Sequence, residues 1–376
     1  MATASPKVIT PVEEARRFMV DCLKAVGMPE GNAVIIADNL LEADKRGLFS
    51  HGMNRLERYI NDLKQGSADG SATPVVAQES TSAVVVDGRN AMGSIVGTFC
   101  MDLAVKKAKE TGIAIAVAFN SNHFGISGIY AKQAIKQGCL GLIFTNTSPI
   151  MVPTRAKQPA LGTNPLAMGA PGNGDEFVLD IATTAVAIGK IEYYKRKNEK
   201  LPEGWALNEE GEVETDPEIA LKSGRLMPLG GTELNSGYKG FGLGMLVEIL
   251  SGLLPGSNYG LLIPKWGAST EIRNLGHCFI AIDPMHFVPG FQDRMTDLME
   301  MMRNLEPIDP ERPVLVPGDV ERENEERVRK EGGICYIQNQ HDTNAKLAQE
   351  LGVQPMGSIA ARPLIDDCKC KEKKKK

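Results

Sequence analysis

The hydrophobic pattern of the first part of the chain is helical. From about residue 11 to residue 66, apolar side chains recur at the spacing of one helix face. VEEARRFMVDCLKAVG (12–27) and EGNAVIIADNLLEADKRG (30–47) each carry such a stripe, and each stops at a glycine, a common helix terminator. In the first segment the stripe is formed by Ala15, Phe18, Met19, Cys22 and Leu23.

The pattern changes near residue 75 to short, continuous apolar runs closed by turn residues, which predict strands. The runs are SAVVVDGRN (82–90), GIAIAVAFN (112–120), CLGLIFTNT (139–147), EFVLDIATT (176–184) and HCFIAIDP (277–284). The helical segment MGSIVGTFCMDLAVKKAKETG (92–112) separates the first two. Strands that alternate with helices predict an α/β domain over residues 75–285.

After residue 286 the pattern is again helical and includes the proline-rich segment EPIDPERPVLVPGD (306–319). We therefore predict a second, helical domain built from both chain ends, residues 1–74 and 286–376. Its last residues, DDCKCKEKKKK, form a basic tail that we interpret as a solvated charge run.

Composition narrows the class of protein. The 376 residues are 42% hydrophobic and 24% charged, as in soluble globular proteins. A formal net charge of −5 gives no reason to expect nucleic acid or an anionic membrane as partner, and no apolar run reaches the length of a bilayer span. Seven scattered cysteines fit a reducing compartment, so we expect a cytoplasmic protein.

The segment SHGMNRLERYINDLKQG (50–66) offers the first candidate chemistry. As a helix, it places Met53, Leu56, Ile60 and Leu63 on one stripe, and on the opposite side His51, Arg55 and Tyr59. An imidazole, a guanidinium and a phenol on one face can bind a carboxylate, with the arginine making the bidentate pair. The alternative is an ordinary solvated face.

His123 lies in FNSNHFGISGIYAKQA (119–134), in a loop between a predicted strand and a predicted helix. Open α/β sheets bind ligands at such strand ends. An imidazole with a pKa near 6.5 can take a proton from a hydroxyl group at neutral pH. A loop histidine without a function is the alternative interpretation.

Two further segments offer places for an anion. Asp180 ends a predicted strand, and Thr183 or Thr184 can cap the helix that we expect to follow, whose first N–H groups would bind a phosphate or a carboxylate. Lys239 and Gly240 stand just ahead of an apolar helix. The glycines there either admit a phosphate or let two helices pack closely, and the pattern favours close packing.

Several motifs are absent from the sequence. No G-x-G-x-x-G follows a strand, and the chain contains neither a P-loop nor a G-x-S-x-G nucleophile elbow. No H-E-x-x-H or Cys/His cluster occurs, so we expect no metal. The residues alone predict an α/β enzyme with a working histidine and an anion site.

Five ordered blocks then give a resemblance. SHGMNRLERY, NSNHFGISGIYA, GTNPLAMGAP, LDIATTAVAIGKI and GYKGFGLGMLVEILSG together resemble the malate/L-lactate dehydrogenase family that lacks a Rossmann fold. That family also includes sulfolactate and ureidoglycolate dehydrogenases and reductases of cyclic imino acids. The likeness runs from about residue 11 to residue 340 and implies an NAD(P)-binding α/β domain flanked by helices from both chain ends, in a homodimer.

The resemblance also implies roles for individual residues. His123 matches the proton donor–acceptor, and the substrate-side cluster corresponds to Ser50, His51, Arg55 and Tyr59. The segments implied to contact the cofactor contain Asp180, Ile181, Ala182, Thr183, Lys239, Gly240, Thr147, Ser148, Pro317 and Gly318. Thr163 and Asn164 match positions near the substrate. The stretch LGGTELNSGYKG and the basic tail depart from the family pattern.

The expected function is hydride transfer between NAD, or alternatively NADP, and a small 2-hydroxy or 2-oxo acid, with malate or lactate as the first candidates. A reductase of cyclic 2-imino acids is the alternative enzyme. A family member that binds organic acids or NAD without turnover is the alternative of another class.

Overall fold

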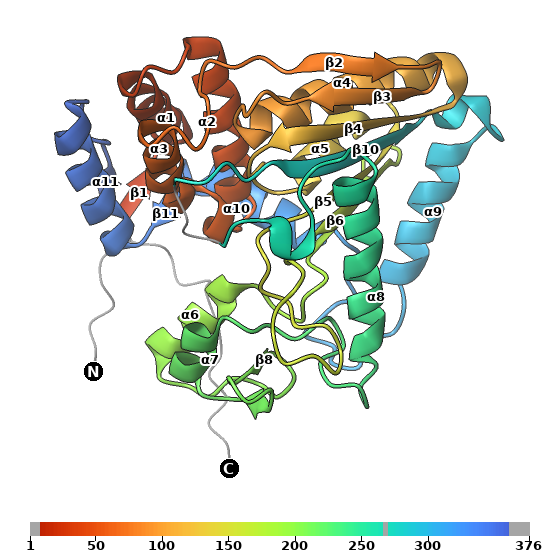
Figure 1. Ribbon diagram of the computed structural model, residues 1–376. Helices are drawn as coiled ribbons and strands as arrows, with labels where there is room; N and C mark the ends of the chain where they lie inside the picture. The colour runs from red at the N-terminus through yellow and green to blue at the C-terminus, as the bar shows by residue number, and fades with distance from the viewer. Residues whose placement is uncertain (1–7, 266–269, 361–376) are drawn as a thin grey trace.

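A mixed sheet forms the centre of the computed structural model shown in Figure 1, which describes residues 8–265 and 270–360. Within these residues its seven strands run in the order β2-β3-β4-β10-β5-β6-β7. Their bounds are Val75–Glu79, Ala83–Asp87, Ile113–Ser121, Leu275–Ile282, Leu140–Thr145, Leu166–Pro171 and Glu176–Ile181. The predicted α/β class is confirmed. The basic tail at residues 361–376 lies outside the described residues.

Only one pair of neighbours in this described sheet, β3 and β4, is parallel, and α4 (Gly93–Thr111) connects them. The other neighbours are antiparallel: β2–β3, β5–β6 and β6–β7 are consecutive in sequence, whereas β10 returns from far along the sequence and inserts between β4 and β5. Each of the five apolar runs corresponds to a strand of this sheet. The hydrophobic pattern did not predict β2, which is an exposed edge strand, or β6, whose glycine and proline weaken the signal.

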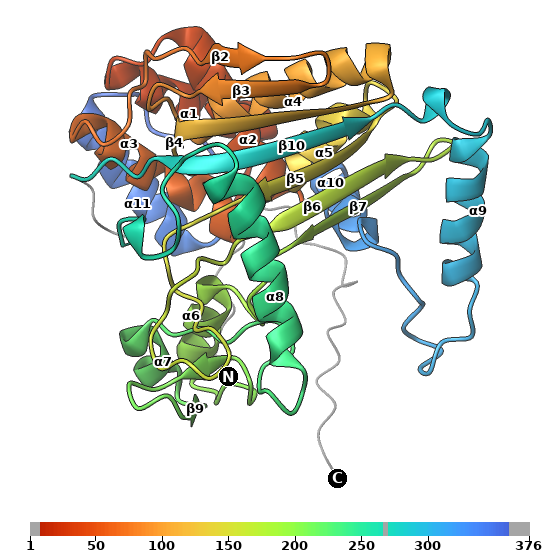
Figure 2. The same cartoon turned by 45° about the vertical axis from the view of Figure 1, so that its right-hand side comes forward.

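Helices cover both faces of the sheet. On one face α4 and α5 (Gly128–Ile135) pack on alternate residues of the strands, and on the other α8 (Gly237–Glu248) does so. Figure 2 shows α8 in front of the sheet, with α4 and α5 behind it. α8 continues into a single π-helical turn, Ile249–Leu253, which contacts β10.

Both chain ends share a second hydrophobic core beside the sheet. It is formed by α1 (Val12–Ala25), α2 (Glu30–Lys45), α3 (Leu56–Lys64), α10 (Asp319–Glu331) and α11 (Gln338–Leu351), with a small sheet of β11, β1 and β12 among the described residues. These strands span Ile334–Tyr336, Val8–Thr10 and Ile359–Ala360. The hydrophobic pattern did not reveal them, because two or three residues contain too few alternations.

Two regions extend beyond these cores. The segment with α6 (Ile188–Lys197), β8 (Ala206–Leu207), β9 (Val213–Glu214) and α7 (Pro217–Ser223) has a small core of its own below the sheet (Figure 1). α9 (Phe291–Arg303) packs beside β6. The division into domains at residues 75 and 285 stays a prediction, and the α6–α7 lobe is an addition to it.

Candidate active site

The segment at residues 50–66 differs from its predicted structure. The predicted helix over residues 50–66 starts only at Leu56, and two 3-10 turns, Phe49–His51 and Met53–Arg55, precede it. The break lies at Gly52, where a Cβ atom would collide with the Asp44 carboxylate. Asp44 also accepts a hydrogen bond of 2.9 Å from the Met53 N–H. His51 therefore does not share a helix face with Tyr59.

The pair Tyr59 and His123 joins α3 to the loop that follows β4. The Tyr59 hydroxyl lies 2.8 Å from His123 Nδ1, and the His51 ring stacks on the His123 ring with centroids 5.6 Å apart. Tyr59 is 1% exposed, so the alternative of a solvated polar face is wrong for this residue. The predicted position of His123, just beyond the end of a strand, is confirmed.

Arg55 lies at the edge of this cluster, where its Nε donates a hydrogen bond of 2.6 Å to the Ser50 carbonyl oxygen. Ser50 in turn places its hydroxyl 2.9 Å from His51 Nδ1. Burial lowers the pKa of Arg55, whereas the nearby Tyr59 and Glu192 raise it. A guanidinium remains charged through such shifts, so Arg55 can serve as the anchor for a carboxylate.

Both histidines of the cluster favour their neutral forms. Burial, together with the charges of His51 and Arg55, lowers the pKa of His123 well below its ordinary value of 6.5. Burial also lowers the pKa of His51, to about 4. At neutral pH, His123 is therefore able to accept a proton.

A pocket beside His123 opens at the ends of β5 and β6. The side chains on its walls are largely neutral hydroxyl, amide and ring groups, and the residues that line it are His51, His123, Phe124, Gly125, Thr145, Asn146, Thr147, Thr163, Pro165 and Leu275. The Thr147 hydroxyl accepts a hydrogen bond of 2.9 Å from the Thr163 N–H. The structure thus brings Thr147 and Thr163 together beside the two histidines, as the motifs suggested.

Two other predicted residues face away from this pocket. The Ser148 hydroxyl donates to the Pro264 carbonyl oxygen at 2.8 Å. Asn164 is fully buried: its amide donates to the Gly244 carbonyl oxygen and the Glu248 carboxylate, and its own oxygen accepts from the Thr147 N–H. Both side chains hold the pocket wall in place from behind.

His277 is a part of the site that the sequence reasoning missed. It lies on β10, with Nδ1 2.7 Å from the Thr145 hydroxyl and Nε2 2.7 Å from the Ser121 hydroxyl. Both ring nitrogens of His277 are thus paired with hydroxyl groups, one on β5 and one on β4. The ring also stacks on Phe124, next to His123. Its only sequence signal was a histidine inside an apolar strand.

The cofactor segment Asp180–Thr183 continues from the end of β7. Asp180 accepts a hydrogen bond of 2.6 Å from the Gly128 N–H, and burial raises the pKa of Asp180 to about 6. After the half-buried Ile181 and then Ala182, Thr183 donates to the Thr163 carbonyl oxygen at 3.0 Å and so reaches the pocket wall. The predicted threonine cap is wrong, because α6 begins only at Ile188.

Lys239 and Gly240 do not form a turn ahead of a helix, as the sequence suggested, because α8 already begins at Gly237. A Cβ atom at Gly240 would collide with the Leu229 backbone, so this glycine permits close packing. This contact is with a turn and not with a second helix, so the close-packing alternative holds only in this different form. Lys239 is exposed in the first helical turn, and its contact with a cofactor stays a prediction.

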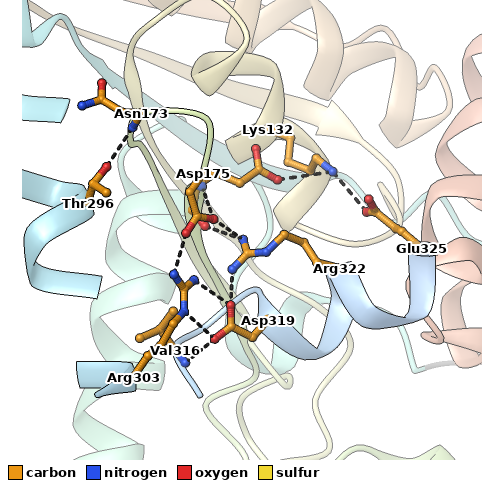
Figure 3. A network of polar contacts seen from close by, with 10 residues as sticks. Lys132, Asn173, Asp175, Thr296, Arg303, Val316, Asp319, Arg322 and Glu325 are labelled. Carbon is orange, nitrogen blue, oxygen red and sulfur yellow. Dashed lines mark hydrogen bonds and ion pairs between the residues drawn. The ribbon is translucent and has the colours of Figure 1, made fainter. Parts of the chain in front are cut away.

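Pro317 and Gly318 form a turn that rests against β7, where the Pro317 carbonyl oxygen accepts a hydrogen bond of 3.1 Å from the Val178 N–H. A group of ion pairs fixes this turn, and we call it the edge network: Asp175, Arg303, Asp319 and Arg322. Figure 3 shows how it joins the β6–β7 hairpin, α9 and α10. The turn is therefore held near the Asp180 strand by contacts within the protein.

A larger surface hollow of about 490 Å³ lies elsewhere, between the end of α1 and the turn at Arg89 and Asn90. Small residues and glycines make up much of its lining. The smaller pocket is our candidate active site, because His51 and His123 line it.

The comparisons with known proteins identify the family of the chain. The profile of the family described as malate/L-lactate dehydrogenase matches residues 10–343. A malate dehydrogenase of Pyrococcus horikoshii is 42% identical over 297 residues, which cover 78% of this chain and 82% of that protein. An L-sulfolactate dehydrogenase of Methanocaldococcus jannaschii is 36% identical, covering 92% and 98%. The crystal structure of malate dehydrogenase from Entamoeba histolytica superposes with a TM-score of 0.88 at 31% identity, covering 93% and 99%.

The mixed sheet carries a half-buried histidine beside a buried tyrosine, and the family match makes the chain an oxidoreductase that works on hydroxy acids. The chain belongs to the malate/L-lactate dehydrogenase family. Within the described residues, no helix combines the length and the apolar character needed to cross a membrane.

Proposed function

We propose that the chain oxidises a small 2-hydroxy acid, malate first and lactate second, with NAD as the cofactor and NADP as the alternative. The observation that carries the proposal is the 2.8 Å contact between Tyr59 and a half-buried, neutral His123, close to Arg55. The neutral hydroxyl and amide groups of Thr145, Asn146, Thr147 and Thr163 suit the carboxamide end of a nicotinamide.

A bound nicotinamide cofactor supplies the acceptor or donor of the hydride. Arg55 anchors the carboxylate of the substrate through its guanidinium fork. His123 accepts the hydroxyl proton of the substrate, and as an imidazolium it can donate from Nδ1 to the Tyr59 oxygen, which lies 2.8 Å away. Tyr59 then stabilises the imidazolium that forms. In the reverse direction, the protonated ring returns this proton to the 2-oxo oxygen.

The lowered pKa of His123 should affect oxidation and reduction differently. In the free enzyme the neutral ring is ready to act as the base of the oxidation. Reduction needs the protonated ring, and the negative charge of a bound carboxylate raises the pKa of His123 toward that form. We therefore expect the pH optimum for reduction to lie below the optimum for oxidation.

A panel of substrates tests the proposal. Malate, lactate and sulfolactate are each supplied with NAD and with NADP, and reduction of the nicotinamide is followed by absorbance. We expect turnover with at least one hydroxy acid. Faster reduction of piperideine-2-carboxylate than of any 2-oxo acid would favour the cyclic imino-acid reductase. Binding of NADH without any turnover would favour a non-catalytic family member.

We also propose that the chain works as a homodimer. Large apolar side chains are exposed along α8 and its continuation, among them Leu246, Ile249, Leu253 and Leu254, between 44% and 55% exposed. The resemblance also suggests that the N-terminal helices contribute to the interface, and the apolar stripes of these helices are buried in the second core. Sedimentation of a Leu246→Glu/Leu253→Glu variant tests this surface, and we expect a monomer. A Leu298→Glu variant on α9 should remain dimeric.

The proposed compartment is the cytoplasm. Among the cysteines that the structure describes, Cys22, Cys100, Cys139 and Cys278 are buried free thiols. Thiols persist in a reducing compartment. Fractionation of cells that express the chain tests this proposal, which a secreted product would contradict.

A further inference from the structure

Glu248, the last residue of α8, is a buried acid that the mechanism above does not use. It is 4% exposed, and the helical chain continues beyond it into the π-helical turn. An acidic side chain is rarely buried without a specific role. The surroundings of Glu248 indicate what that role is.

Three neutral N–H donors surround the carboxylate, and each comes from a different segment. Oε1 accepts from the Asn146 amide at 3.3 Å and from the Gly260 N–H at 2.9 Å. Oε2 accepts from the Asn164 amide at 2.5 Å. Donors on both oxygens match an ionised carboxylate, which accepts on all sides and donates nothing.

Two of these donors lead to the pocket beside His123. Asn146 lines the pocket itself and follows Thr145, which is hydrogen-bonded to His277. Asn164 accepts a hydrogen bond from the Thr147 N–H and stands next to Thr163 in the chain. The Asn146 oxygen in turn accepts from the Gly276 N–H at 3.0 Å, which ties the arrangement to β10.

We propose that Glu248 is a positioning residue that fixes the Asn146–Thr147 and Thr163–Asn164 walls relative to His123. This inference rests on the proposed function, because the walls are assigned there to the nicotinamide side of the site. A glutamine amide at this position would point its own N–H group at the N–H donors on one side of Glu248. The segment that carries those donors would then have to move. A displacement of about 1 Å can cost a factor of about 10² in rate.

The test compares Glu248→Gln with Val247→Ala. Val247 is the preceding residue; it is fully buried against the sheet in the cluster of Val117 and Phe144, and it does not line the pocket. At a temperature where both variants are folded, we expect kcat/KM to fall by about tenfold or more in Glu248→Gln. Val247→Ala should lower Tm yet stay within about twofold of the wild-type kcat/KM. Equal kinetic losses in the two variants would overturn the proposal.

Exchanging donor and acceptor gives a second measurement. In Glu248→Gln/Asn164→Asp, the new glutamine donates to the new carboxylate, and that carboxylate still accepts from the Thr147 N–H. We expect kcat/KM of this double variant to be at least about threefold higher than that of Glu248→Gln, because contacting residues couple energetically. A double variant that is no better than the product of its two single effects would contradict a direct contact.

Hydrogen exchange separates this proposal from the proposed function. The amide hydrogens of Thr147 and Gly260 should exchange faster in Glu248→Gln than in the wild type, and at wild-type rates in Val247→Ala, whether or not the substrate is known. Unchanged exchange at both amides overturns the positioning role. Faster exchange in a chain that turns over no 2-hydroxy or 2-imino acid would overturn only the proposed function.

Discussion

The pocket at His123 and the edge network at β7 are both clusters of polar side chains, but they have opposite effects on the ionisation of those side chains. In the edge network the hydrogen bond from Arg303, against the effect of burial, helps to lower the pKa of Asp319 to about 2. In and around the pocket, burial lowers the pKa of His51 to about 4 and raises the pKa of Asp44 to about 7. The network keeps its groups ionised, and the pocket favours their neutral forms.

The difference follows from the available partners and from solvent. Arg303 pairs with Asp175 at 2.7 Å and with Asp319 at 2.7 Å, and its side chain is 27% exposed. His123 is instead surrounded by a phenol, a second imidazole and positive charges. Ion pairs hold structure, whereas a buried neutral imidazole can exchange a proton. Substitutions in the pocket should therefore change rates, and substitutions in the network should change stability.

The largest effect is expected from His123→Ala, which removes the proton acceptor. We expect kcat to fall by about 10²–10⁴-fold, the contribution of general acid–base catalysis, while NADH binding changes little. The matched control is His286→Ala, which removes an exposed histidine on another edge of the sheet. Steady-state kinetics and NADH fluorescence measure the two quantities. Turnover near the wild-type rate would transfer the catalytic role to His51.

Arg55→Lys should have the next largest effect. A lysine keeps the charge but lacks the planar fork, so we expect KM for the hydroxy acid to rise by about tenfold or more. The control Arg16→Lys changes an arginine on α1 that pairs with Asp38 at the surface. An unchanged KM would show that Arg55 only braces the Ser50 carbonyl oxygen.

Local sequence signals predicted residues that the structure brings together at the candidate site, but not the residues that support them. His123, Arg55 and Tyr59 stand in short ordered motifs, and the end of an apolar run placed His123 correctly. The prediction of a helix over residues 50–66 was wrong because the helix is interrupted at Gly52. The residue that Gly52 packs against is Asp44, which lies outside this segment, on α2. No local pattern contains that contact.

The supporting residues lie still farther apart in the sequence. His277 bridges Ser121 and Thr145, which are 156 and 132 residues away, and Glu248 reaches Asn146 and Asn164 across 102 and 84 residues. The cause is the insertion of β10 between β4 and β5, which the hydrophobic pattern cannot show. A lone histidine in a strand and a lone acid in an apolar helix were the only signals, and both were visible in the sequence.

The comparison also predicts a difference in pH dependence. The pKa of Asp44 is about 7 in the folded protein, against an ordinary value of 3.8, so the folded state holds this proton more tightly than the unfolded chain does. Asp44 therefore lowers stability progressively as pH rises from about 4 to about 7. In Asp44→Asn this loss is removed, and the free energy of unfolding relative to wild type should increase from pH 5 to pH 8.

Urea unfolding at pH 5, 6, 7 and 8 measures that difference. The histidines with lowered pKa values act in the opposite direction below pH 6.5, but they are common to both proteins and cancel. Asp319→Asn is the control, because its pKa is lowered to about 2 and it should destabilise the protein nearly equally at all four pH values. A constant difference between Asp44→Asn and wild type would show that Asp44 does not titrate in this range.

The smallest effect is expected from Arg303→Met, which breaks the edge network while keeping much of the side-chain volume. Partly exposed ion pairs contribute little, so we expect a loss of about 1 kcal/mol in the free energy of unfolding. High salt should reduce the loss, because it screens these pairs. The Pro317–Gly318 turn keeps its hydrogen bond to β7, so NADH affinity and kcat should stay within about twofold. A strong loss of NADH affinity in Arg303→Met would show that the edge network shapes the cofactor site, and the contrast between the two regions would then fail.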